Sequence, residues 1–249
     1  MNRDQLIRYA ILSDVHGNLE ALTAVLKDAE AEGANALLCL GDLVGYGADP
    51  VACVERVGES ATAVVAGNHE HGAVGLMRLD WFNALARAAA VWTRDRLDAD
   101  HHRYLAQLPL VREIEEATLV HASPRHPEEW DYLLSAEDGF EVFGDFSTRL
   151  CFVGHSHRPD VWSLGSGGPE HAGFVSPRLK LEDGRRYVVN GGSVGQPRDH
   201  DPRAAYLIWD RDDRAITIRR VAYDHRRAAQ KILAAGLPRR LAERLAHGV

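Results

Sequence analysis

Lysine and cysteine are scarce in this sequence of 249 residues. Lys27, Lys180 and Lys231 are its only lysines, so arginine is left as the main candidate to bind oxyanions with its planar guanidinium. The three cysteines are odd in number and form no CxxC pair, which argues against a disulfide framework and a cysteine-based zinc site. The sequence also lacks a run of about 18 apolar residues, so we expect no membrane span.

The charge balance excludes further partners. The net charge is -7, and no basic patch with interleaved aromatic residues occurs, so we expect neither nucleic acid nor membrane as a partner. The first residues lack the apolar segment and cleavage site of a signal peptide, which together with free thiols predicts a cytoplasmic protein. The length favours one domain over residues 1–249, with a helical tail from about residue 228 to 249. Its oligomeric state is left open.

The first third of the chain alternates between strand and helix patterns. Strands are predicted at Tyr9–Leu12, Ala36–Leu40 and Ala63–Ala66, and helices at Leu19–Glu32 and Pro50–Val57. This βαβαβ order predicts right-handed crossovers and a parallel sheet.

The rest of the chain is first helical and then rich in strands. Apolar spacing predicts a helix over Trp81–Leu97, whose Trp81 and Phe82 we interpret as core residues. Further predictions are a helix at Asp100–Gln107, strands at Val111–Ile114, Thr118–Val120, Leu150–Val153, Val161–Leu164, Tyr187–Val189, Tyr206–Trp209 and Ile216–Arg220, and a helical tail over Ala228–Leu245.

Metal-ligating residue types recur just past the predicted strand ends, where open α/β sheets place their sites. They are Asp14, His16, Asp42, Asn68, His121, His155 and His157. Seven oxygen and nitrogen ligands exceed what one ion needs and suit two ions that share a carboxylate. The mixture of carboxylate, carboxamide and imidazole favours Mn, Fe, Zn or Ni over Mg, and we favour Mn.

The motifs SDVHGN, GDLVGYG, GNHE, a single His121 and GHSH occur in this order along the chain. As an ordered set they resemble the calcineurin-like metallophosphoesterase superfamily. The later stretch NGGSVGQPRD and the GLP-containing tail resemble the small prokaryotic branch of YfcE-like phosphodiesterases. The resemblance implies an α/β fold, a four-layer αββα sandwich in which helices flank two mixed sheets.

The resemblance also implies roles for the ligands. Asp14, His16 and His157 would bind one metal, Asn68, His121 and His155 would bind the other, and Asp42 would bridge them. Two such ions generate a bridging hydroxide that attacks phosphorus. His69, which we expect at the rim of the centre, would protonate the leaving group as general acid, so Asp42 and His69 are the predicted catalytic residues.

The sequence departs from the protein phosphatases of this superfamily at Gly45-Tyr46-Gly47. Those enzymes carry Asp-Arg-Gly there, so an orienting carboxylate and a phosphate-binding arginine are missing from this position. Asn68 and His69 remain as predicted substrate contacts. Arg125, Arg158 and Arg198 lie after motifs or in the Gly-rich loop and are the candidate phosphate readers. Tyr46, Trp130 and Tyr132 are weaker candidates for substrate contact.

Four functions fit these residues to different degrees. The leading hypothesis is hydrolysis of small phosphodiesters or phosphomonoesters. Symmetrical dinucleoside tetraphosphate hydrolysis uses the same centre and is the main alternative. A non-catalytic protein-binding scaffold would lack several ligands, whereas this chain keeps all of them. A nuclease is disfavoured because the sequence has no basic patch.

Overall fold

A computed structural model describes residues 7–174 and 176–249 of the chain. Its strands are β1 (Arg8–Leu12), β2 (Ala36–Cys39), β3 (Ala63–Val64), β4 (Val111–Ile114), β5 (Ala117–Val120), β6 (Leu150–Val153), β7 (Pro159–Gly165), β8 (Gly168–His171), β9 (Arg178–Lys180), β10 (Arg186–Gly191), β11 (Ala204–Asp210) and β12 (Ala215–Val221). Its helices are α1 (Leu19–Ala31), α2 (Pro50–Ser60), α3 (Asn68–Val74), α4 (Ala84–Arg94), α5 (Ala99–Ala106), α6 (Ala136–Glu141), α7 (His225–Ala234) and α8 (Arg239–Glu243), with short 3-10 turns η1 (Leu79–Trp81), η2 (Pro127–Glu129), η3 (Val142–Gly144) and η4 (Arg244–Ala246).

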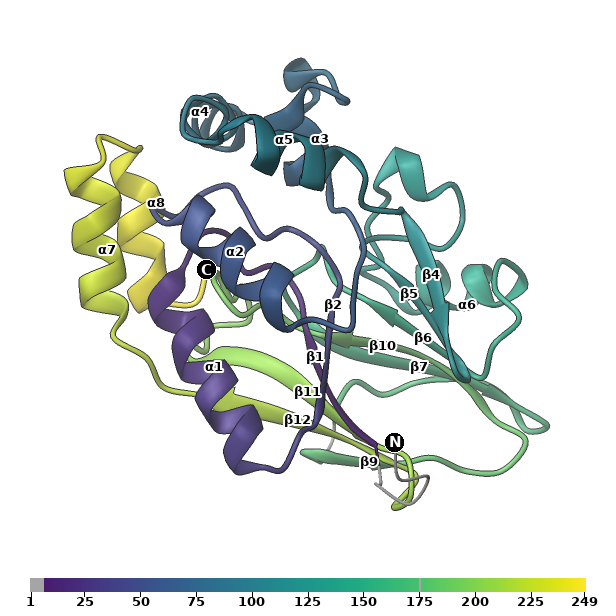
Figure 1. The fold of residues 1–249 in the computed structure, drawn as a ribbon. Helices are drawn as coiled ribbons and strands as arrows, with labels where there is room; N and C mark the ends of the chain where they lie inside the picture. The colour runs from purple at the N-terminus through teal and green to yellow at the C-terminus, as the bar shows by residue number, and fades with distance from the viewer. Residues whose placement is uncertain (1–6, 175) are drawn as a thin grey trace.

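The strands form two mixed sheets of six strands each. Their orders are β3-β2-β1-β11-β12-β9 and β4-β5-β6-β10-β7-β8. As predicted, β1, β2 and β3 are parallel, while β11 and β12 add antiparallel neighbours. Helices lie outside the two sheets, with α1 and α2 on one side and α6 on the other (Figure 1). The predicted αββα sandwich is therefore confirmed.

Alternation along β1 explains the layering. Tyr9 and Ile11 point into the core between the two sheets, whereas Ala10 and Leu12 pack in the core beneath α1 and α2. This follows from the two-residue period of a strand, which sends successive side chains to opposite faces. The strand is buried on both faces, so its carboxyl end projects its next residues into a loop at the edge of the sheet.

The tail forms α7, α8 and η4, and Gly236-Leu237-Pro238 separates α7 from α8. It docks against α4 through an apolar cluster that contains Ala89 and Ile232, and α7 also packs beside α1. Lys231 adds ion pairs to Glu20 and Asp49, at 2.7 and 2.8 Å. No helix in the described part of the chain is long and apolar enough to cross a membrane.

The predicted helix over Trp81–Leu97 is wrong at its start. Trp81 ends the short turn η1, and α4 begins only after Asn83, whose side chain accepts hydrogen bonds from the backbone N–H groups of Leu85 and Ala86. The helical spacing of apolar residues continues across Asn83, so the sequence pattern does not reveal this cap. The sequence interpretation of Trp81 as a core residue is also wrong, because its side chain is 66% exposed.

Candidate metal centre

The predicted ligands lie at one end of the sandwich, in loops that follow the strands or, for Asn68, at the start of α3. Asp14 and His16 follow β1, Asp42 follows β2, and His155 and His157 follow β6. All five have left-handed backbone, with φ between +49° and +66°. Non-glycine residues in this region cost about 1–3 kcal/mol each and persist where the surroundings hold them, which is typical of functional sites.

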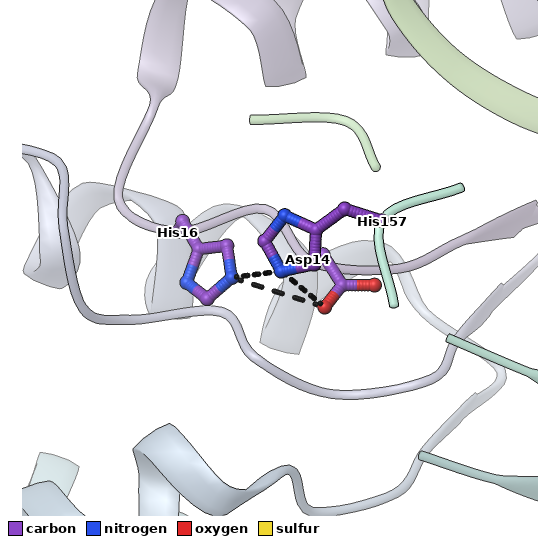
Figure 2. Close-up of side chains that lie close together, drawn as sticks. All are labelled: Asp14, His16 and His157. Atoms are coloured by element: carbon purple, nitrogen blue, oxygen red, sulfur yellow. Dashed lines mark hydrogen bonds and ion pairs between the residues drawn. The ribbon is translucent and has the colours of Figure 1, made fainter. Parts of the chain in front are cut away.

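The first cluster consists of Asp14, His16 and His157 (Figure 2). His157 Nε2 lies 3.1 Å from Asp14 Oδ1 and 3.1 Å from His16 Nε2. All three side chains are buried, and Asp14 Oδ1 has no hydrogen-bond partner. A buried carboxylate oxygen that faces two imidazole nitrogens without a hydrogen bond suits a cation between them.

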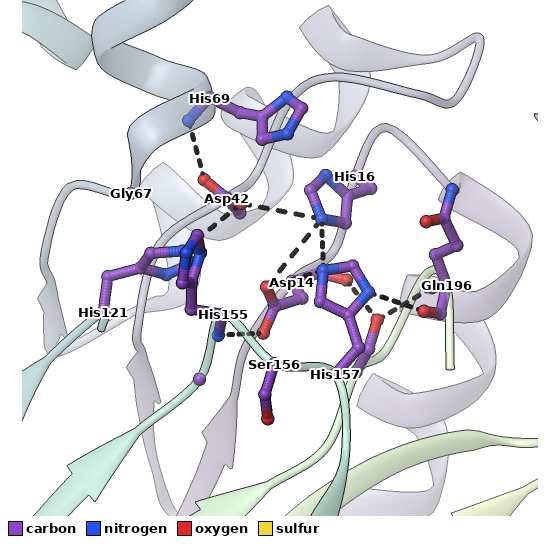
Figure 3. Close-up of polar contacts among 12 residues, drawn as sticks. Asp14, His16, Asp42, Gly67, His69, His121, His155, Ser156, His157 and Gln196 are labelled. Atoms are coloured by element: carbon purple, nitrogen blue, oxygen red, sulfur yellow. Dashed lines mark hydrogen bonds and ion pairs between the residues drawn. The ribbon is translucent and has the colours of Figure 1, made fainter. Parts of the chain in front are cut away.

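The second cluster consists of Asp42, His121 and His155 (Figure 3). His121 Nε2 lies 3.2 Å from His155 Nδ1 and 3.3 Å from Asp42 Oδ2. Asn68, the first residue of α3, is buried, and it lines the same cleft as Asp42 and His155. Its Oδ1 also has no hydrogen-bond partner, so it too fits a metal ligand.

Asp42 connects the clusters. Its Oδ2 lies 3.6 Å from His16 Nε2 of the first cluster and 3.3 Å from His121 Nε2 of the second. Its other oxygen, Oδ1, accepts a hydrogen bond from the backbone N–H of His69 at 2.9 Å. One oxygen is thus fixed to the protein, and the other faces both groups of imidazoles (Figure 3).

Backbone carbonyls orient three of the imidazoles. The Nδ1 atoms of His16, His121 and His157 lie 3.0, 2.7 and 2.6 Å from the carbonyl oxygens of Val44, Leu40 and Gln196. Each Nδ1 therefore carries a proton and donates it, which leaves Nε2 as the nitrogen that faces the centre and could bind a metal. Metal-binding histidines commonly have such a partner on the second nitrogen.

The buried carboxyl and imidazole groups of the centre shift one another's pKa values. Burial opposes ionisation of Asp14, but the neighbouring His157 holds the pKa of this carboxyl well below its usual value. Burial lowers the pKa of His155 to about 3, and the charge of His121 lowers it further. Burial also lowers the pKa of His121, yet the carboxylate of Asp42 outweighs this effect and raises the pKa to about 9. Two buried carboxylates thus need positive charge beside them.

Glu70 is a buried residue of the site to which the sequence analysis assigned no role. Its carboxylate accepts hydrogen bonds from the backbone N–H groups of Asp42, Val44 and Gly67, at 2.7, 3.2 and 2.8 Å. It thereby ties the Asp42 loop to the start of α3. Burial, together with the charge of Asp42, raises the pKa of Glu70 to about 7. Its place in GNHE, beside two other site residues, was the available signal.

Replacement of Glu70 by glutamine tests this positioning role. The amide NH₂ cannot accept a backbone N–H, so at least one of the three hydrogen bonds should be lost and the Asp42 loop should loosen. We expect metal affinity to fall about 10- to 100-fold, as is typical for partners behind the ligands. Metal titration of the folded variant measures this, with the exposed Glu59→Gln as control. Unchanged metal affinity in Glu70→Gln would show that the Asp42 loop keeps its position without these hydrogen bonds.

The Gly-rich stretch after β10 supports the first cluster. Ser193 Oγ donates to the carbonyl of Asp14 at 2.9 Å, and Gly195 N–H donates to the same carbonyl at 2.9 Å. Asn190 Nδ2 donates to the carbonyl of Gly154, just before His155, at 2.7 Å. The motif NGGSVGQ therefore fixes the two ligand-bearing loops relative to each other.

His69 is not at the rim where the sequence placed it. Its side chain is buried between Tyr46 and Phe82, whose ring centroids lie 4.5 and 4.9 Å from the imidazole. A Cβ at Gly45 would lie 2.2 Å from His69 Nδ1, so only glycine fits against this ring. His69 still lines the cleft, because α3 starts at Asn68 and turns the ring inward.

The three candidate arginines have different environments. Arg198 lines the cleft, and its Nε has no hydrogen-bond partner. Arg125 instead pairs with Glu141 and Asp145 at 3.1 and 3.0 Å. Arg158 is exposed and donates to the backbone carbonyl of Arg198 at 3.0 Å. The structure therefore brings Arg198 to the cleft but not Arg125 or Arg158.

The cleft over the clusters has a volume of about 190 Å³ and is partly open to solvent. Its aromatic wall comprises Tyr46, Trp81, Phe82, Trp130 and Tyr132. Trp130 is buried, whereas Tyr132 is 47% exposed and stacks on His155 at a centroid distance of 3.9 Å.

Comparison with known proteins agrees with this geometry. A model of the calcineurin-like phosphoesterase family matches residues 7–159, which include the ligands of both clusters. The chain belongs to the calcineurin-like phosphoesterase family. As a calcineurin-like phosphoesterase it is a metal-dependent hydrolase of phosphate esters, and the family uses divalent metal ions.

Relatives of this calcineurin-like phosphoesterase cover most of its length. The uncharacterized protein MJ0912 of Methanocaldococcus jannaschii is 42% identical over 95% of this chain and 96% of its own. A metallophosphoesterase from Sphaerobacter thermophilus is also 42% identical, with a TM-score of 0.85 over 98% of this chain and 100% of its own. Similar solved structures also include the E. coli phosphoesterase YfcE, at 20% identity and a TM-score of 0.44 over 87% of this chain and 100% of its own.

Proposed function

We propose that the chain hydrolyses small phosphodiesters or phosphomonoesters in the cytoplasm at a centre of two divalent transition-metal ions. Asp14, His16 and His157 would hold one ion. Asn68, His121 and His155 would hold the other, and Asp42 would bridge them. The observation that carries the proposal is the position of Asp42 Oδ2, which lies within 3.6 Å of an imidazole nitrogen from each cluster.

The donor set supports manganese or a similar metal. Each cluster combines at least one carboxylate oxygen with two imidazole nitrogens, and Asn68 adds a carboxamide oxygen. Such mixed sites suit Mn, Fe, Zn or Ni better than Mg. When bound, such ions lower the pKa of a water molecule and neutralise the phosphoryl oxygens.

The side chains of the cleft would supply the remaining chemistry. Arg198 would orient the phosphate through its guanidinium, whose Nε is free of other hydrogen bonds. His69 would donate a proton to the leaving oxygen from its place beside the Asp42 loop, a contribution typically worth about 10²–10⁴-fold. Tyr46 and Phe82 hold its ring in position and exclude water around it.

Chelation and metal return test the proposed function. Stripped of metal, the protein should lose hydrolysis of bis(p-nitrophenyl) phosphate and melt at a lower temperature, because ions that bind only the folded state stabilise it. Mn should restore both properties, with activity compared against Ni, Zn, Fe and Mg. A phosphoserine peptide should be a much poorer substrate, since Gly45-Tyr46-Gly47 replaces the phosphatase motif. Unchanged melting and activity after verified metal loss would contradict the proposal.

A further inference from the structure

An exposed tryptophan stands in the cleft. Trp81 is 66% exposed, whereas Trp162 and Trp209 are completely buried. Burial of an indole is strongly favourable, so a large exposed indole usually has a binding role when it lies in a concave site. Among the residues that the structure describes, no other ring stacks on that of Trp81. Its side chain is therefore largely accessible to a ligand.

The backbone that follows the indole is held firmly. Phe82, the next residue, is buried and stacks on His69 with 24° between the ring planes. Asn83 then caps α4 through two hydrogen bonds. Trp81 is therefore presented at a fixed place relative to the reacting end of the cleft, although its own ring is free.

The two parts of the cleft differ in chemistry. The metal clusters and Arg198 form a part that suits a phosphate group. Trp81, Met77 and the half-exposed Tyr132 give the cleft further apolar and aromatic lining. The cleft has a volume of about 190 Å³ and is partly open to solvent, so a ligand bound in it need not be enclosed on all sides.

We propose that Trp81 forms a subsite that stacks on a flat aromatic ring in the ester group of the substrate, and that the substrate class is nucleotides. This inference rests on the proposed phosphoesterase function and adds the identity of the ester group. Every nucleobase has a π-face, and stacking on an aromatic side chain contributes strongly to nucleotide binding. The phosphate would be held by Arg198 and the metal centre while the base lies on the indole.

A matched pair of substrates tests the subsite. Adenosine 5′-monophosphate and ribose 5-phosphate have the same phosphate and leaving oxygen and differ in the base. In Trp81→Ala, KM for adenosine 5′-monophosphate should rise roughly 5- to 150-fold, the range expected for loss of one stacked base. KM for ribose 5-phosphate should change less than about twofold. Trp81→Phe should retain most of the affinity, and Leu233→Ala, which alters an exposed apolar residue on α7, should change neither KM.

The other outcomes are distinguishable. Equal losses on both esters, or no loss on either, would overturn the subsite and leave the phosphoesterase function intact. A change in oligomeric state of Trp81→Ala on sedimentation, with both KM values unchanged, would overturn it in favour of a protein contact. If the metal-loaded wild type hydrolyses neither ester, the proposed function fails for this class. In that case calorimetry of adenosine 5′-monophosphate binding still tests the subsite, which predicts weaker binding to Trp81→Ala than to Trp81→Phe.

Discussion

Replacement of Asp42 by alanine should remove bound metal and reduce kcat by more than about 100-fold, beyond the loss that is typical when a partner behind a ligand is changed. The reason is the double position of this carboxylate. Oδ2 faces imidazoles of both clusters, and Oδ1 accepts the N–H of His69. Loss of the side chain would therefore weaken both metal sites and loosen the start of α3.

Asp28→Asn is the matched control for Asp42→Ala. Asp28 lies outside the site. Its carboxylate pairs with Arg219 at 3.0 Å and accepts a hydrogen bond from the hydroxyl of Tyr206 at 2.7 Å. The hydrogen bond from Arg219 is the main reason that the pKa of this carboxyl is lowered. The control should lose some stability but keep its metal. Metal content by mass spectrometry and kcat on one diester compare the two variants. A fully metal-loaded, active Asp42→Ala would contradict the bridging role.

Replacement of His69 by alanine should leave both ions in place and slow hydrolysis in a way that depends on the leaving group. A high-pKa alkoxide needs a proton, so kcat for an alkyl ester should fall by about 10²-fold or more. A nitrophenolate departs without one, and its loss should be much smaller. His71→Ala is the control, since His71 lies on the same helix but contacts Trp130 instead of the metal clusters.

Two results would change the role of His69. If kcat of His69→Ala falls by the same factor for both leaving groups, His69 is a phosphate-orienting residue and not a general acid. Loss of metal from His69→Ala would make it a ligand. Its ring lies close enough to His16 and Asp42 for the second result to be tested seriously.

Local patterns predicted the parts of the fold that depend on local chemistry. Apolar runs that end at Ser13, Gly41 and Gly67 predicted β1 to β3, and the carboxyl ends of parallel strands necessarily meet at one edge of a sheet. The ordered motifs then located the polar residues that this edge brings together. The positions of Asp14 and Asp42 at the centre could therefore be anticipated from the sequence.

Long side chains and helix starts could not be predicted in this way. Arg125 follows a motif, yet its guanidinium turns to Glu141 and Asp145, which only the folded chain brings near. Trp81 fits a helical period in the sequence, but the cap at Asn83 makes α4 begin after it. The sequence alone does not show which of two adjacent apolar residues will be left in solvent.

Anomalous scattering from crystals of the Mn-loaded protein tests the dinuclear centre most directly. We expect two well-occupied manganese peaks. One should lie among Asp14, His16 and His157, the other among Asn68, His121 and His155, and both should contact Asp42. A single well-occupied peak in metal-replete protein, with Asn68 and His121 turned away from it, would contradict a two-metal phosphoesterase centre.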